Sequence, residues 1–223
     1  MKFISTRGGS PAVSASAAIL RGLAPDGGLY VPETIPTCDM QALLGLSYKE
    51  TAEKILRLYL SDFTDEEISF CVNNAYTAAK FGGEDPAPIH TLKSGKHILE
   101  LWHGPTCAFK DMALQMLPHL LSVSLKKQKE DRTAVILVAT SGDTGKAALE
   151  GFCDAESTKI LVFYPSDGVS DMQKLQMITQ KGGNVRSCGI IGNFDDFSVF
   201  NCDFCMHSGA SGAVNNPSIL DQK

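Results

Sequence analysis

Residues 134–150, which read AVILVATSGDTGKAALE, decide the fold class of this 223-residue chain. The apolar run at 134–139 is typical of a buried strand, and the glycine-containing turn at 140–145 leads into helix-favouring residues at 146–150. The segment therefore predicts a strand, a tight turn and a helix in direct succession.

Two further units of the same kind follow along the chain. A strand expected at 160–164 leads to a helix opened by Ser170 and Gln173, and a strand expected at 185–191 leads to a helix beginning near Asn193. Strands that alternate with helices at this spacing predict a parallel sheet in an α/β fold.

The first part of the chain favours helices instead. Ser47 with Glu50, and Thr64 with Glu67, have the spacing of a capping box, and apolar residues follow each pair at helical intervals. We therefore expect a mostly helical N-terminal region in which these two helices pack as a pair.

Between these parts the pattern changes twice. Apolar segments around Ile89 and at 97–102 flank a Ser-Gly turn at 94–95 and predict a β-hairpin. The pattern at 110–129 predicts a helix in which Pro118 causes a kink or a break. The expected divisions are a helical region at 1–88, a hairpin and helix at 89–130, a small α/β domain at 131–208 and an irregular tail at 209–223.

Composition narrows the class of ligand. The chain has 20 Lys and Arg against 25 Asp and Glu, and no apolar run has the length of a signal peptide or a membrane span. A net charge of −5 does not favour nucleic acid or an anionic membrane, so we expect a cytoplasmic protein with a small-molecule ligand.

The odd number of cysteines, 7, predicts reduced thiols. Cys202, Cys205 and His207 lack a fourth ligand with zinc-site spacing, so no metal is expected.

The turn at 140–145 is a candidate anion site. A helix N-terminus there would aim backbone N–H groups at one point; Gly142 and Gly145 allow close approach, and Ser141 and Thr144 add hydroxyl donors. A tight turn capped by polar residues explains the spacing equally well. The turn lacks residues that a P-loop or a serine-hydrolase elbow requires, which disfavours both of those functions.

Lys110 is the second candidate. It lies where the expected hairpin leads into a helix, next to Phe109, Ala108 and Met112. Most lysines are solvated surface charges. Apolar neighbours would disfavour the protonated amine, however, and would leave a nucleophile able to form a Schiff base with a carbonyl group.

Several motifs in the right order closely resemble the threonine synthase family. They are LELWHGPT at 99–106 with FKD at 109–111, ATSGDTG at 139–145, STRG at 5–8, APDGGLYVP at 24–32, and a further match within 164–177. The similarity is continuous from about residue 3 to residue 200.

The resemblance implies a truncated form of the tryptophan synthase β-like, fold-type II architecture. It implies pyridoxal 5'-phosphate as cofactor and O-phosphohomoserine as substrate, which reacts with water to give threonine and phosphate. The family lysine that binds the cofactor and moves the substrate proton corresponds to Lys110, and Asp143, where relatives often carry Asn, would contact the cofactor. The residues implied to bind the substrate carboxylate are Ser141, Gly142, Thr144 and Gly145.

The family pattern also implies that a second half, with the loop for the cofactor phosphate, is missing, so that the chain by itself could lack turnover. Two other functions stay open. One is another lyase with the same cofactor, such as a hydroxy amino acid dehydratase or a phospho-lyase that gives a keto acid. The other is a noncatalytic fragment that binds a small anion or a partner subunit through an unusually apolar surface, which would also allow self-association.

Overall fold

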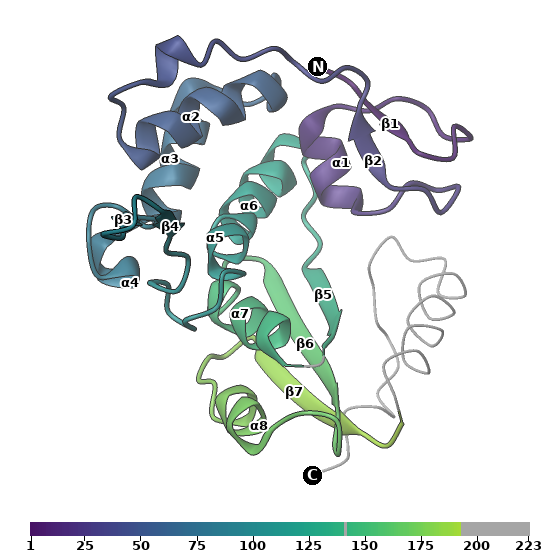
Figure 1. The fold of residues 1–223 in the computed structure, drawn as a ribbon. Coiled ribbons are helices and arrows are strands. Elements are labelled where there is room, and N and C mark those ends of the chain that lie inside the picture. Colours follow the sequence, from purple (N-terminus) through teal and green to yellow (C-terminus); the bar gives the residue numbers. More distant parts are fainter. Residues whose placement is uncertain (141, 193–223) are drawn as a thin grey trace. The chain divides into compact units, whose positions relative to one another are not determined.

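The chain divides into two compact units, Met1–Asp131 and a second that begins at Arg132 (Figure 1). The computed structural model describes residues 1–140 and 142–192. Within those ranges no helix is long and apolar enough to cross a bilayer. Several predictions lie outside the described residues: Ser141, the helix near Asn193, the cysteine pair Cys202 and Cys205 with His207, and the tail at 209–223. The division into four parts is finer than these two units and stays a prediction.

The first unit combines helices with two short antiparallel strand pairs, β1 with β2 and β3 with β4. The predicted hairpin at residues 89–102 is confirmed by the second pair. Pro118 follows a break between two helices, as predicted. The elements are β1 (Phe3–Ser5), α1 (Ala15–Arg21), β2 (Tyr30–Pro32), η1 (Gln41–Leu43), α2 (Tyr48–Tyr59), α3 (Asp65–Ala75), α4 (Ala78–Phe81), β3 (Ile89–Thr91), β4 (His97–Leu99), α5 (Asp111–Leu114) and α6 (Leu117–Lys127).

Helices α2 and α3 begin at the two predicted capping boxes. The Ser47 hydroxyl accepts from the Glu50 N–H, and the Glu50 carboxylate accepts from the Ser47 N–H at 2.8 Å. Thr64 and Glu67 make the same reciprocal pair at the start of α3. Each box satisfies N–H groups that a helix N-terminus leaves without intrahelical partners. The two helices also contact each other, so the predicted packing as a pair is confirmed.

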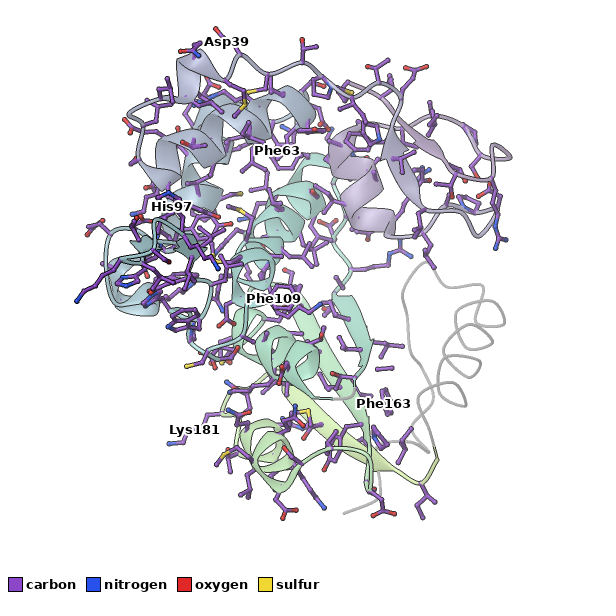
Figure 2. All side chains as sticks on the ribbon, viewed as in Figure 1. Asp39, Phe63, His97, Phe109, Phe163 and Lys181 are labelled. Atoms are coloured by element: carbon purple, nitrogen blue, oxygen red, sulfur yellow. The ribbon has the colours of Figure 1, made fainter. Side chains whose placement is uncertain are left out.

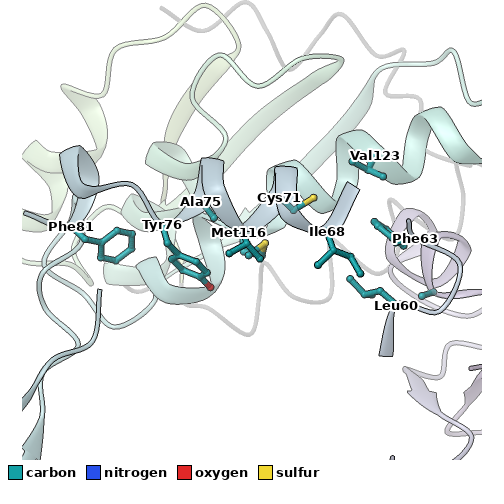
Figure 3. Packing of buried hydrophobic residues seen from close by; sticks show 11 residues of the cluster. Leu60, Phe63, Ile68, Cys71, Ala75, Tyr76, Phe81, Met116 and Val123 are labelled. Atoms are coloured by element: carbon teal, nitrogen blue, oxygen red, sulfur yellow. The ribbon is translucent and has the colours of Figure 1, made fainter. Parts of the chain in front are cut away.

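The core of the first unit lies along α3. Its buried side chains Ile68, Cys71, Val72 and Ala75 recur at helical spacing and form one apolar stripe, and Met116 belongs to the same cluster (Figure 3). Burial raises the pKa of the Cys71 thiol to about 12, so this cysteine stays a protonated core residue.

Hydrogen bonds to Ser16 in α1 link three segments of the first unit. Asp62, between α2 and α3, accepts hydrogen bonds from the Ser16 N–H at 3.1 Å and from the Ser16 hydroxyl at 2.5 Å. The amide of Gln128, just after α6, donates to that same hydroxyl at 2.7 Å. The contact therefore joins α1 to both neighbouring segments.

Asp62 should make this unit sensitive to acid. Burial of the carboxyl group opposes its ionisation, but the hydrogen bonds from Ser16 outweigh burial and hold the pKa of Asp62 below the ordinary 3.8. Because the pKa of Asp62 is lower in the folded than in the unfolded chain, its ionised form stabilises the folded state. This stabilisation is complete at pH values above the pKa of the unfolded chain, and it is lost as the pH falls through the pKa of the folded chain. We expect the urea midpoint to fall more steeply below pH 3.8 in the parent chain than in Asp62→Asn. Parallel acid profiles would contradict this role.

The N-terminal motifs STRG and PDGG meet at one carboxylate. Asp26 accepts from the Ser5 hydroxyl at 2.7 Å, from the Gly28 N–H at 2.9 Å and from the Gly9 N–H at 2.7 Å. The Ser5 hydrogen bond contributes most to lowering the pKa of Asp26. These contacts close the loops beside the β1 and β2 pair, which gives both motifs a structural role.

The second unit is a three-stranded sheet in the order β5-β6-β7, and its strands are parallel, as the sequence predicted. Helix α7 packs on β5 and β6, α8 packs on β7, and the two helices contact each other, so they share one face of the sheet. The helix after the glycine turn begins at Asp143, three residues before the predicted start at 146. The elements are β5 (Ala134–Ala139), α7 (Asp143–Gly151), β6 (Thr158–Pro165), α8 (Asp171–Ile178) and β7 (Val185–Ile190).

Candidate active site

Lys110 ends an irregular segment that connects β4 to α5 in the first unit. Its side chain is half-buried, and its Nζ atom lies 4.7 Å from the ring centroid of Phe109, within cation–π range. Phe109, labelled in Figure 2, is itself 61% exposed. The predicted apolar contact with Phe109 is therefore present, although this ring faces solvent more than the sequence suggested.

Lys110 lines a pocket of about 490 Å³ that lies within the first unit. Among the described residues that line it, Lys110 is the one charged group and the others are apolar or aromatic. They are Tyr48, Ala87, Leu99, Leu101, Phe109, Met112 and Ala113. A ligand in this pocket would therefore meet an amine on an apolar wall, which is how pockets for small organic molecules are commonly built.

Two tyrosines hold one wall of this pocket in place. The Tyr48 ring packs edge-on against the Tyr76 ring with centroids 4.9 Å apart. Burial raises the pKa of Tyr76, so its hydroxyl stays protonated and donates to the Met112 carbonyl at 2.7 Å. This hydrogen bond fixes α5, and with it the backbone next to Lys110, to the end of α3.

The surface of the first unit near the pocket carries many apolar side chains. All residues of β3 and β4 are exposed, and large side chains there are at least 40% exposed. The exposed large apolar residues between positions 89 and 109 are Ile89, Leu92, Ile98, Leu99, Trp102 and Phe109.

The second unit carries the glycine turn, and a hydroxyl that the sequence analysis did not single out organises it. Thr140, at the end of β5, is 3% exposed. Its Oγ1 accepts from the Gly142 N–H at 3.0 Å and from the Gly145 N–H at 2.9 Å. These two N–H groups therefore hold the turn together and are not the donors that an anion would find.

In the described part of the turn, the remaining backbone N–H donors belong to Asp143 and Thr144. They occupy the first two positions of α7, where backbone N–H groups have no intrahelical partner, and the described part of the chain offers these two no acceptor. The helix N-terminus adds a partial positive charge. The Asp143 side chain is exposed and accepts from Gln173 Nε2 at 3.0 Å.

Close contacts require Gly145, and the backbone conformation favours glycine at position 142. A Cβ atom on Gly145 would lie 2.3 Å from Thr140 Cγ2 and 2.8 Å from Val162 Cγ1. A Cβ atom on Gly142 would lie 2.3 Å from Gln173 Nε2, and its φ of +147° disfavours any other residue. Gln173 was predicted only as a capping residue of α8, so its contact with the turn is an addition to the site.

The predicted site residues thus fall into two groups. Lys110 lies in the first unit, whereas the turn residues Gly142, Asp143, Thr144 and Gly145 lie together in the second. That the two groups face one cavity remains a prediction.

Sequence reasoning missed Thr140 and the buried Asp111. A Thr at a strand end before Gly-rich residues, and an Asp directly after the lysine, were the available signals.

Comparison with known proteins shows which family the chain resembles. Residues 2–76 match the family model for the threonine synthase N terminus. Over 200 residues the chain is 41% identical to threonine synthase from Pseudomonas aeruginosa, covering 88% of this chain and 42% of that protein. Over most of its own length the chain is similar to the N-terminal part of threonine synthases. It spans less than half the length of the threonine synthases it matches.

Solved structures agree with this threonine synthase relationship. The PLP-bound threonine synthase from Brucella melitensis superposes with a TM-score of 0.82 at 37% identity, covering 93% of this chain and 45% of that one. Among curated sequences, threonine synthase-like 2 from Rattus norvegicus is 38% identical over 201 residues, covering 88% of this chain and 41% of that protein. The predicted α/β architecture is therefore confirmed as that of the N-terminal part of threonine synthases.

Proposed function

We propose that this chain supplies the lysine-bearing half of a threonine synthase active site, which uses pyridoxal 5'-phosphate to convert O-phosphohomoserine and water into threonine and phosphate. The observation that carries the proposal is the half-buried Lys110 on an apolar pocket. The similarity to a threonine synthase whose structure holds PLP supports the choice of cofactor.

The residues of the pocket fit this cofactor. Pyridoxal phosphate has a flat aromatic ring and an aldehyde, and the pocket combines apolar and aromatic walls with one primary amine. An aldehyde condenses with a lysine amine, and apolar walls favour the ring faces. Lys110 would hold the aldehyde carbon, and Tyr48 and Met112 would adjoin the ring.

Lys110 would both hold the cofactor and move a proton of the substrate. Bound pyridoxal phosphate supplies an electron sink for the carbon that carries the substrate amine and carboxylate. The Lys110 Nζ would hold the cofactor and, when free of it, would accept the proton from that carbon and return it at a later step. Its place on the pocket wall keeps the amine within reach of the substrate.

The glycine turn would bind the substrate carboxylate. Among the described residues of the turn, the backbone N–H groups of Asp143 and Thr144 are the ones without an acceptor, and the N-terminus of α7 favours an anion. Gly142 and Gly145 act through the turn geometry, because Thr140 engages their N–H groups. Ser141 and the Asp143 side chain stay as proposed contacts of substrate and cofactor.

The test is a titration of the chain with pyridoxal phosphate, followed by addition of O-phosphohomoserine and analysis of products. We expect a saturable visible absorption band, and release of phosphate with threonine. The assay is run on the chain alone and on the chain mixed with the C-terminal part of the Pseudomonas aeruginosa relative, because the chain covers 42% of that protein.

The products separate the alternatives. If the products are a keto acid and phosphate, the chain takes part in a phospho-lyase reaction and the proposed reaction is overturned. A visible band without turnover, both in the chain alone and in the mixture, would support cofactor binding but overturn the proposed reaction. No band at all would overturn the proposed use of the cofactor.

A further inference from the structure

The loop that precedes Lys110 is closed by a buried carboxylate. Asp111 is fully buried, and its two oxygens each accept a hydrogen bond from Thr106. The Thr106 N–H donates to Oδ2 at 2.8 Å, and the Thr106 hydroxyl donates to Oδ1 at 2.8 Å. Hydrogen bonds to a charged acceptor are stronger than those between neutral groups. Asp111 and Thr106 therefore form a clamp across residues 106–111.

The backbone between Thr106 and Asp111 includes a residue in an unfavourable conformation. Cys107 has a φ of +59°, in the left-handed region that residues other than glycine rarely adopt. Gly104 is required by the same arrangement, because a Cβ atom there would lie 2.5 Å from the Asp111 side chain. A loop with this conformation keeps its shape only where surrounding contacts determine it, and the clamp supplies two of them.

We propose that Thr106 and Asp111 are positioning residues for the Lys110 amine. Lys110 directly precedes Asp111 in the chain, so the carboxylate that anchors Asp111 also fixes the backbone from which the lysine extends into its pocket. Tyr76, through its hydrogen bond to the Met112 carbonyl, fixes the backbone one residue further along. The proposal rests on the proposed function for its cofactor readout, but the position of the amine can be measured without cofactor.

The cofactor readout uses three threonine variants. Thr106→Val keeps the shape and removes the hydroxyl donor, Thr106→Ser restores it, and Thr91→Val removes a hydroxyl that lies 2.9 Å from His97 Nδ1 on the hairpin. We expect Thr106→Val to weaken binding of pyridoxal phosphate about tenfold, since one charge-assisted hydrogen bond is lost. Thr106→Ser and Thr91→Val should bind as the parent does. Equal affinities in all four proteins would overturn the proposal.

The cofactor-free readout is the rate at which an amine reagent modifies Lys110, measured by mass spectrometry relative to the exposed Lys96 of the same unit. Loss of the clamp should release the half-buried amine and raise this ratio several-fold in Thr106→Val, with recovery in Thr106→Ser. A thermal melt confirms that each variant is folded. An unchanged ratio would overturn the proposal, whether or not the parent binds cofactor. Failure of the parent to bind cofactor, with the ratio changed as expected, would count against the proposed function alone.

Discussion

Lys110→Ala is expected to lose the visible absorption of bound pyridoxal phosphate completely. The pocket wall contains no second amine among the described residues, so no neighbouring group can take over the bond to the aldehyde. The variant should also lose all turnover, because the same amine moves the substrate proton. Absorption spectra during a cofactor titration measure the first effect, and phosphate release measures the second.

The matched control is Lys96→Ala, which removes an exposed lysine between β3 and β4 of the same unit. It should bind the cofactor as the parent does. The urea midpoint of Lys110→Ala should stay at the parent value, because a half-buried lysine with no hydrogen-bond partner in the described residues contributes little to stability. A band that persists in Lys110→Ala would show that another amine carries the cofactor.

Gly145→Ala is expected to destabilise the second unit by about 1–3 kcal/mol, the range for overpacking a well-packed core. The added Cβ atom would lie 2.3 Å from Thr140 Cγ2 and 2.8 Å from Val162 Cγ1. Thr140 and Val162 are both buried, so neither can move aside. Any shift of Thr140 would also disturb its two hydrogen bonds from the turn. Hydrogen exchange of the β5 and β6 amides measures the loss.

Gly183→Ala is the control in the same unit. A Cβ atom on Gly183 would lie 3.6 Å from Asp154 Oδ1, which is an ordinary contact. Its amides in β5 and β6 should exchange as in the parent chain. If Gly145→Ala and Gly183→Ala exchanged alike, the tight contact between α7 and the sheet would not control stability.

Local patterns in the sequence predicted most of the regular elements. The capping boxes at Ser47, Thr64 and Ser170 all form, because each depends on residues only three positions apart. The strand at 134–139 has the bounds predicted for it, since an uncharged run between charged and glycine-rich segments leaves little freedom. Elements whose signal lies within a few residues are therefore accessible from sequence.

Elements held by distant contacts were not accessible in the same way. The β1 and β2 pair has strands of 3 residues, too short for a period, and the Asp26 contacts join segments 17 and 21 positions apart. The start of α7 was placed three residues late, because Thr140 and the glycines suggested a longer turn. The structure shows that Thr140 closes the turn from inside and lets the helix begin at Asp143.

The candidate site was predictable in its residues and less so in its geometry. Lys110 and the turn were identified from residue type and neighbours. Which backbone donors remain free in the turn depends on where the Thr140 hydroxyl points, and pattern alone does not show that. The clamp at Asp111 was missed because an acidic residue at a helix start is ordinarily a solvated one, whereas here it is fully buried.

Reduction of the cofactor-loaded protein with borohydride, followed by peptide mapping, tests the central claim most directly. Reduction fixes pyridoxal phosphate permanently to the amine that holds it. We predict one modified site, at Lys110, with the exposed Lys93 and Lys96 unmodified in the same digest. A label on another lysine, or labels spread over the surface lysines with none at 110, would contradict the account.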